Sequence, residues 1–139
     1  QNCLDWYGHD GNISLEDIVY YYADKDSNDI IIDASNFNNK KGDSEVFGIS
    51  LNELGLYNIE ITMKSEQGSL SQLPLSIYYD NALKSTITIR GTEGEWVTES
   101  RELGFIFGVN HYIKLYFGAS GLDIDKVVIK FIGKGKLPF

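Results

Sequence analysis

Only two histidines, His9 and His111, are available for acid–base chemistry in this chain. A serine or cysteine triad needs a histidine that an acidic residue orients, and no spacing in the sequence joins either histidine to such a pair. Twenty acidic residues offer many carboxylate pairs of the kind that hydrolyse glycosidic bonds. Because the pairs are so many, none of them is informative, and we expect no catalytic residue.

Two features of the sequence bear on metal binding. Cys3 is the only cysteine, which excludes an internal disulfide and any site with several thiolates. The segment from Asp10 to Asp17 is similar to the second half of an EF-hand loop, but Trp6 and Gly8 stand at the first and third ligand positions. Since neither supplies a side-chain oxygen, we interpret this segment as the start of a helix.

Size and charge limit the class of partner. The 139 residues suffice for one domain with one core, and 42% of them are hydrophobic. The formal net charge of -8 argues against nucleic acids and anionic membranes as partners. No apolar stretch is long enough to span a membrane, and no signal segment is present. If the protein is exported, we expect its signal to have been removed or to lie on a parent chain.

The pattern of apolar residues divides the chain near residue 28. Ser14 to Asp17 form a capping box, and Leu15, Ile18, Val19 and Tyr22 follow with helical spacing. We therefore predict a short N-terminal helix that ends between Asp24 and Asp29. Residues 1–28 are predicted to be a helical extension, and residues 29–139 a separate β-domain.

After residue 28 the period changes to two, which indicates half-buried strands. Strands are predicted at 30–34, 46–50, 57–63, 73–79, 86–90, 113–117 and 126–131. Regular strands with glycine-rich turns and no helix between them predict an antiparallel β-sandwich of jelly-roll type. The side chains expected in its core are Tyr57, Ile59, Ile61, Leu75, Ile77, Ile113, Leu115 and Ile129.

Five short segments occur in a fixed order along the predicted β-domain. They are Ile32–Phe37, Gly55–Ile59, Leu73–Tyr78 followed by Asp80-Asn81, Glu95–Thr98, and Gly121–Ile129. In this order they resemble carbohydrate-binding module family 6 and its relatives, including family 35. The resemblance extends from Ile30 to Phe131, about three quarters of the chain.

The resemblance implies two kinds of site. Members often hold a structural calcium ion between the first and last strands, and the matching positions here are Asp33, Ser35 and Asp125. Serine at the position of a family glutamate removes one charge from that site. Asp33 and Asp125 as plain surface carboxylates remain the alternative.

Family members also bind sugar at the loop end of the sandwich, between a tyrosine and a tryptophan, with an asparagine from the closing strand. Asp123 stands at the asparagine position, Trp96 is the one tryptophan in the relevant segment, and Phe47 is the aromatic residue nearest to the tyrosine position. Trp96 is therefore a candidate for the sugar-stacking ring. It also aligns with an inner tryptophan of the family, and this alternative makes it a core residue and leaves the contact to sugar to Glu93 or its neighbours. The alternative is a displaced sugar site that uses Tyr78, Tyr79 or Trp6. The interpretation that competes with it makes these rings core residues.

We therefore expect a non-catalytic carbohydrate-binding module that targets an attached or associated glycoside hydrolase to a polysaccharide or glycan. Its cofactor would be a structural Ca²⁺ ion, and its location secreted or at the cell surface of a bacterium. A β-sandwich spacer or protein-interaction domain that binds no sugar is the principal alternative, and a small acidic hydrolase is the third.

Overall fold

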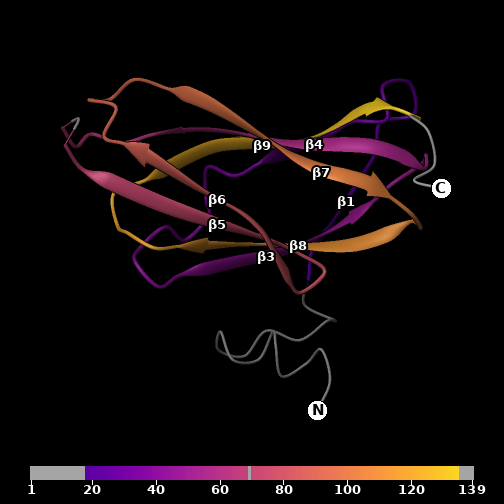
Figure 1. The fold of residues 1–139 in the computed structure, drawn as a ribbon, viewed down its shortest axis with the longest axis horizontal. Coiled ribbons are helices and arrows are strands. Elements are labelled where there is room, and N and C mark those ends of the chain that lie inside the picture. The colour runs from indigo at the N-terminus through magenta and orange to yellow at the C-terminus, as the bar shows by residue number, and fades with distance from the viewer. Residues whose placement is uncertain (1–17, 69, 135–139) are drawn as a thin grey trace, which may run out of the picture.

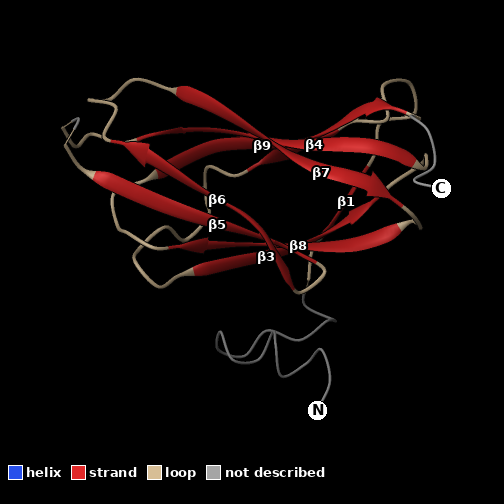
Figure 2. Ribbon diagram, viewed as in Figure 1, coloured by secondary structure: helices blue, strands red, loops and turns tan. Residues whose placement is uncertain are grey.

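The protein is a sandwich of two β-sheets, described by a computed structural model over residues 18–68 and 70–134 (Figure 1). The five-stranded sheet contains, in spatial order, β1 (Tyr20–Tyr22), β3 (Ser44–Ser50), β8 (Asn110–Phe117), β5 (Gln72–Tyr79) and β6 (Ala82–Arg90). The four-stranded sheet contains β2 (Ile30–Asp33), β9 (Asp123–Gly133), β4 (Gly55–Lys64) and β7 (Val97–Ile106). Figure 2 shows strands and loops throughout the described residues and no helix, so none of these residues form a helix that crosses a membrane.

The core lies between the sheets and follows the alternation of the sequence. Along β4, each second residue from Gly55 to Met63 is buried, and the residues between them face outward. All eight side chains that were expected in the core are completely buried. The predicted all-β antiparallel sandwich is therefore confirmed, because a two-residue period places one face of every strand against the opposite sheet.

The predicted N-terminal helix is wrong over the described residues. Tyr20–Tyr22 is strand β1, which pairs in parallel with Gly48–Ser50 of β3. The ring of Tyr20 covers Gly48, where an added Cβ would come within 2.6 Å of ring atoms. Pairing with β3 and the close approach of this ring thus override the weak helical spacing. The capping box before residue 18 lies outside the described residues, and the sandwich includes a strand that precedes residue 29.

Strand order brings four loops to one end of the sandwich. The connections β2–β3, β4–β5, β6–β7 and β8–β9 all lie there, because the chain runs back and forth between them. Backbone and side-chain hydrogen bonds join them: the Lys41 amide donates to Ser120 Oγ (2.8 Å), and the Glu93 amide donates to the Gln67 carbonyl (3.2 Å). We call this end the loop end.

Candidate functional site

A row of three outward-facing side chains crosses the four-stranded sheet at the loop end. Asp123 of β9 lies opposite Lys64 of β4, and the Lys64 ammonium lies 4.8 Å from the ring centroid of Trp96, which precedes β7. The residues beside them in each strand, Met63 and Ile124, are buried. Alternation therefore turns Asp123, Lys64 and Trp96 to the outer surface, and we call them the Trp96 row.

Hydrogen bonds and an ion pair hold the polar members of the row. Asn39 Nδ2 donates to Asp123 Oδ1 and to the Leu122 carbonyl oxygen, each at 2.9 Å. Lys64 Nζ lies 3.5 Å from a carboxylate oxygen of Glu66. The carboxylate, amide and ammonium groups thus come from three different loops or strands but lie around one end of the sheet.

The loop that precedes Trp96 is fixed to the loop after β4. The amides of Thr92 and Gly94 donate to the carbonyl oxygen of Ser65, a fully buried residue. Thr92 Oγ1 accepts from the Ser65 amide at 2.9 Å and donates to its carbonyl oxygen at 3.0 Å. These bonds position Trp96, whose side chain is 48% exposed. An indole with an exposed face can stack on the apolar face of a ring-shaped ligand, while the neighbouring polar groups bond its hydroxyls.

The alternative position for Trp96, in the core, is therefore wrong, and the reason is strand register. Val97, not Trp96, lies opposite the buried Met63 on the inner side. Glu93 lies in the same loop, in a left-handed turn with φ of 53° and with an exposed side chain. No contact between Glu93 and the Trp96 row is recorded in the described residues.

Phe47 as a sugar-stacking ring is also wrong. The ring is 2% exposed and packs on Tyr21 and Phe37, with centroid distances of 5.8 and 5.9 Å. It has no free face for a ligand because β3 turns it into the core. Tyr78 lies on the outer face of the other sheet, where Lys114 Nζ is 5.4 Å from its ring centroid. The structure does not bring Tyr78 to the Trp96 row.

Tyr79 and His111 form a separate cluster with Asp80. His111 Nδ1 lies 2.6 Å from Asp80 Oδ2 and 3.0 Å from the Tyr79 hydroxyl. Burial, with a smaller contribution from the charge of Asp80, raises the pKa of Tyr79. His111 Nε2 is buried, and no hydrogen-bond partner among the described residues reaches it. A triad requires a nucleophile at that nitrogen, and the described residues supply none there. Trp6 and His9 lie outside the described residues.

Two of the predicted calcium ligands, Asp33 and Asp125, lie on the neighbouring strands β2 and β9, and Ser35 lies in the turn after β2. Asp33 ends β2, and the Ala34 amide donates to the Asp125 carbonyl oxygen of β9 at 3.1 Å. The hydroxyl and amide of Ser35 donate to Asp33 Oδ1 at 2.7 and 3.0 Å and hold the pKa of that carboxyl below its usual value. Among the described residues, no three histidine, cysteine or acidic side chains group as metal ligands.

Sequence reasoning missed Asn39, Lys64 and Glu66. Lys64 could have been identified from the sequence, because it extends the outward-facing positions of the predicted 57–63 strand by one residue. Asn39 and Glu66 could not have been identified, since both lie in loops whose path depends on contacts with distant segments, such as the bonds from the amides of Thr92 and Glu93 to the loop of Glu66.

Comparison with known proteins identifies the fold. No protein-family model matches the sequence. A β-glucosidase of Ruminococcus albus is 33% identical over 104 residues, which are 75% of this chain and 11% of that protein. This chain thus spans about a tenth of that relative.

Solved structures agree over a similar part of the chain. A β-glucosidase of Paenibacillus barengoltzii matches with a TM-score of 0.64 at 20% identity, over 83% of this chain and 11% of that one. The C-terminal family 6 module of the laminarinase LamC from Zobellia galactanivorans matches with a TM-score of 0.62 at 19% identity, over 74% and 99%. A family 6 module of Cellvibrio mixtus lichenase 5A, solved with cellotriose, and modules of families 35 and 36 also match. The chain therefore has the β-sandwich fold of the family 6, 35 and 36 carbohydrate-binding modules.

Proposed function

We propose that this chain is a non-catalytic module that binds a neutral glycan through the Trp96 row. The observation that carries the proposal is the exposed ring of Trp96 next to Lys64, in line with Asp123, at the loop end. An aromatic face provides apolar contact area at little cost in side-chain entropy. The carboxylate of Asp123 accepts, and the ammonium of Lys64 donates, hydrogen bonds to hydroxyls.

The relatives support a role beside a glycoside hydrolase. Both β-glucosidases are about nine times longer than the part that matches this chain. Several matching modules are parts of a laminarinase, a lichenase or a xylanase. We propose that this chain likewise directs an attached or associated hydrolase to its polysaccharide, and that it acts outside a bacterial cell, as a secreted or cell-surface protein.

Replacing Asp123 by alanine is expected to weaken sugar binding about tenfold or more, because bound hydroxyls lose their charged acceptor. Asn39 keeps its bond to the Leu122 carbonyl oxygen, so the loop stays in place. Calorimetric titration with cellotriose, laminaritriose and xylotriose measures the effect. The wild-type dissociation constant is expected at about 10 μM to 1 mM, since few contacts offset the lost freedom of the ligand.

Two variants control this titration. Asp123→Asn keeps an acceptor and is expected to retain most of the affinity, and Asp26→Ala removes an exposed carboxylate from the β1–β2 turn. If Asp123→Ala binds with the same affinity as the wild type, Asp123 is not part of the site. If a broad glycan screen of the folded protein finds no ligand, the chain is a spacer or protein-interaction domain.

We further propose that calcium stabilises the fold at Asp33, Ser35 and Asp125. The support is the position of Asp33 and Asp125 on the paired strands β2 and β9, with Ser35 two residues after Asp33, and the ionised state that Ser35 favours for Asp33. Two carboxylates and a hydroxyl fall short of the six to eight oxygens that calcium takes, so backbone carbonyls and water would complete the site. Such a site is expected to bind calcium weakly, with a dissociation constant of about 10⁻⁴ to 10⁻³ M.

Millimolar calcium is expected to raise the melting temperature, because an ion that binds only the folded state stabilises it by mass action. Asp125→Asn should abolish the rise, and Asp33→Asn should reduce it. Thermal unfolding with and without chelator measures both effects, and elemental analysis verifies removal of the ion. An unchanged melting curve for protein verified to be calcium-free would refute the site.

A further inference from the structure

The end of the sandwich opposite to the loop end carries exposed apolar side chains. β4 begins there, and β7 and β9 end there (Figure 1, right-hand side). Leu54 before β4 is 49% exposed, Phe107 after β7 is 50% exposed, and Ile132 near the end of β9 is 51% exposed. Single exposed apolar residues are ordinary on a protein surface, but a contiguous group marks an interaction surface.

Strand pairing joins these side chains into one group. Leu56 of β4 lies opposite Phe105 of β7 and Gly133 of β9. Alternation along β4 turns Leu56 outward, and residues directly opposite in antiparallel strands face the same side. The ring centroids of Phe105 and Phe107 are 4.8 Å apart. We call Leu54, Leu56, Phe105, Phe107 and Ile132 the far-end patch.

Polar contacts at the rim of the far-end patch hold it in one arrangement. The Tyr57 hydroxyl donates to the Glu53 carbonyl oxygen at 2.7 Å, and the Glu53 carboxylate lies 3.6 Å from the Lys134 ammonium. The Leu51 amide donates to the Val109 carbonyl oxygen at 2.8 Å and so joins the β3–β4 loop to the β7–β8 loop. A partner that binds here orders few additional groups, which lowers the entropic cost of binding.

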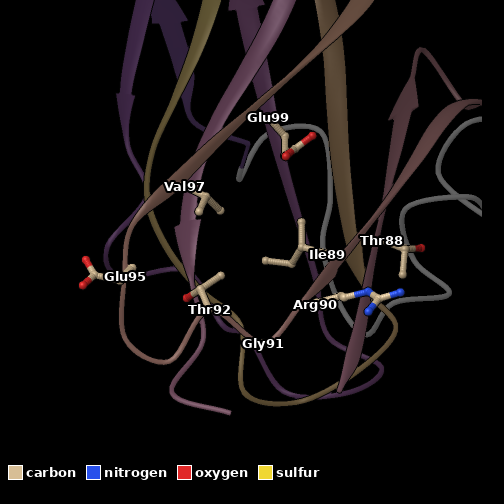
Figure 3. Close-up of a pocket in the computed structure, with 8 residues that line it drawn as sticks. All are labelled: Thr88, Ile89, Arg90, Gly91, Thr92, Glu95, Val97 and Glu99. Atoms are coloured by element: carbon tan, nitrogen blue, oxygen red, sulfur yellow. The ribbon is translucent and has the colours of Figure 1, made fainter. Parts of the chain in front are cut away.

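The cavity of about 430 Å³ between β6 and β7 is less suited to a protein partner (Figure 3). Its apolar side chains are Val97 and Ile89, which is only 7% exposed, and Glu95 and Glu99 add two carboxylates. Glu99 lies opposite the buried Ile61 and so turns inward. Inward charges protect an edge strand from pairing with other chains. The far-end patch has no charged member, so it is the better surface for a partner.

We propose that the far-end patch packs against an attached hydrolase, joined to this chain after residue 139. The choice of partner rests on the proposed function. β9 ends in the patch at Gly133, and Lys134 lies at its rim. The five residues from Gly135 to Phe139 span at most about 18 Å. Polypeptide that follows them therefore begins close to the patch.

Size and charge favour an attached domain over a separate molecule. A stable complex of two free proteins involves roughly 20–30 residues on each partner, far more than the far-end patch contains. A short tether raises the effective concentration of its partner to about the millimolar range, which allows a small apolar contact to persist. A second copy of this chain is disfavoured, because a net charge of -8 on each copy causes repulsion.

This contact leaves the Trp96 row free to bind glycan. Lys64 of the row and Leu56 of the patch face outward from the same strand. The eight residues between their positions correspond to about 26 Å at about 3.3 Å per residue. A hydrolase on the far-end patch would therefore hold the row at a fixed distance, pointing away from the hydrolase.

Hydrogen–deuterium exchange tests the contact by comparing the full-length protein that contains this chain with the chain alone. Amides of the loops 51–54 and 107–109 are expected to exchange at least about fivefold more slowly in the full-length protein, because the docked hydrolase opposes their local opening. Amides of the loop-end segment 91–96 should exchange equally in both proteins. Mass spectrometry of peptic fragments measures each segment.

The variant Phe107→Lys in the full-length protein places a charge in the far-end patch and is expected to remove this protection. Phe107→Leu keeps an apolar side chain and should retain most of it. Leu70→Lys is the matched control, because it adds the same charge at a loop-end residue that is 92% exposed, and it should leave the protection unchanged. Melting curves show that each variant is folded.

The outcomes separate this inference from the proposed function. Equal exchange of 51–54 and 107–109 in both proteins would overturn the contact, and so would protection that survives Phe107→Lys. Sedimentation that shows dimers of the chain alone, lost in Phe107→Lys, would assign the patch to a second copy and also overturn it. Titration of the Trp96 row with sugars is independent of these results. Protection of the patch without sugar binding would support the contact and reject the glycan site.

Discussion

Replacing Ile61 by alanine is expected to lower the free energy of unfolding by about 2–5 kcal/mol. The side chain is completely buried at the centre of the sandwich. It belongs to β4, between Glu99 of β7 and Val127 of β9. Both neighbouring strands hold the backbone there, so the core cannot collapse fully around the lost methyl groups, and a cavity remains. Denaturant unfolding followed by two spectroscopic probes measures the change.

Glu60→Ala is the matched control, because it changes the adjacent residue of the same strand on the opposite face. Glu60 lies opposite Ser100 and Val128 and is turned outward. Its replacement is expected to change the free energy of unfolding by no more than about 0.5 kcal/mol. A loss below about 0.5 kcal/mol for Ile61→Ala would contradict the register of β4.

The core was predictable because most strands alternate without interruption. Tyr57 to Met63 and Leu73 to Tyr79 repeat apolar residues at every second position, and only one face of such a strand can be buried favourably. Each predicted strand is present, with ends that differ by at most four residues. Strand ends depend on turns and pairing partners, which a period does not encode.

β7 was missed because its inner face carries charge. Glu99 and Arg101 occupy positions that would be apolar in a fully covered strand. An edge strand tolerates them, since its outer side is open to solvent. The sequence therefore lacks the alternation that revealed the other long strands. β1 was missed for a different reason: Ile18, Val19 and Tyr22 fit a helix as well as a short strand, and its pairing with β3 is long-range.

For the site residues too, local alternation was informative and long-range pairing was not predictable. The family pattern assigned Phe47 to the sugar site and offered the core as an alternative position for Trp96, and local alternation decides against both. Phe47 points inward with Ile49, two residues later, and both are buried. Val97 takes the inner position at the start of β7, so Trp96 faces outward. Neither the family pattern nor the alternation identified Lys64 as the partner of Trp96, because their contact depends on the pairing of β4 with β7.

Trp96→Ala is expected to weaken glycan binding at the row by at least about tenfold in affinity, and to leave the fold intact. A central aromatic side chain commonly contributes about 2 kcal/mol or more to a binding site. At 48% exposed, the ring contributes little to the core, so the free energy of unfolding should fall by less than about 1 kcal/mol. The contact with Lys64, with its ammonium 4.8 Å from the ring centroid, adds about 0.5–1 kcal/mol at an exposed site.

Titration and thermal unfolding of the same samples separate binding from stability. Trp96→Phe is the matched variant: it keeps a smaller aromatic face and is expected to bind with intermediate affinity. Leu70→Ala, at a residue that is 92% exposed, is the control for removing a large apolar side chain at the loop end. If Trp96→Ala unfolds more easily by about 3–5 kcal/mol, the ring is a core residue and its binding loss is secondary. If it binds as well as wild type, the Trp96 row is not the glycan site, because no other member of the row offers an aromatic face.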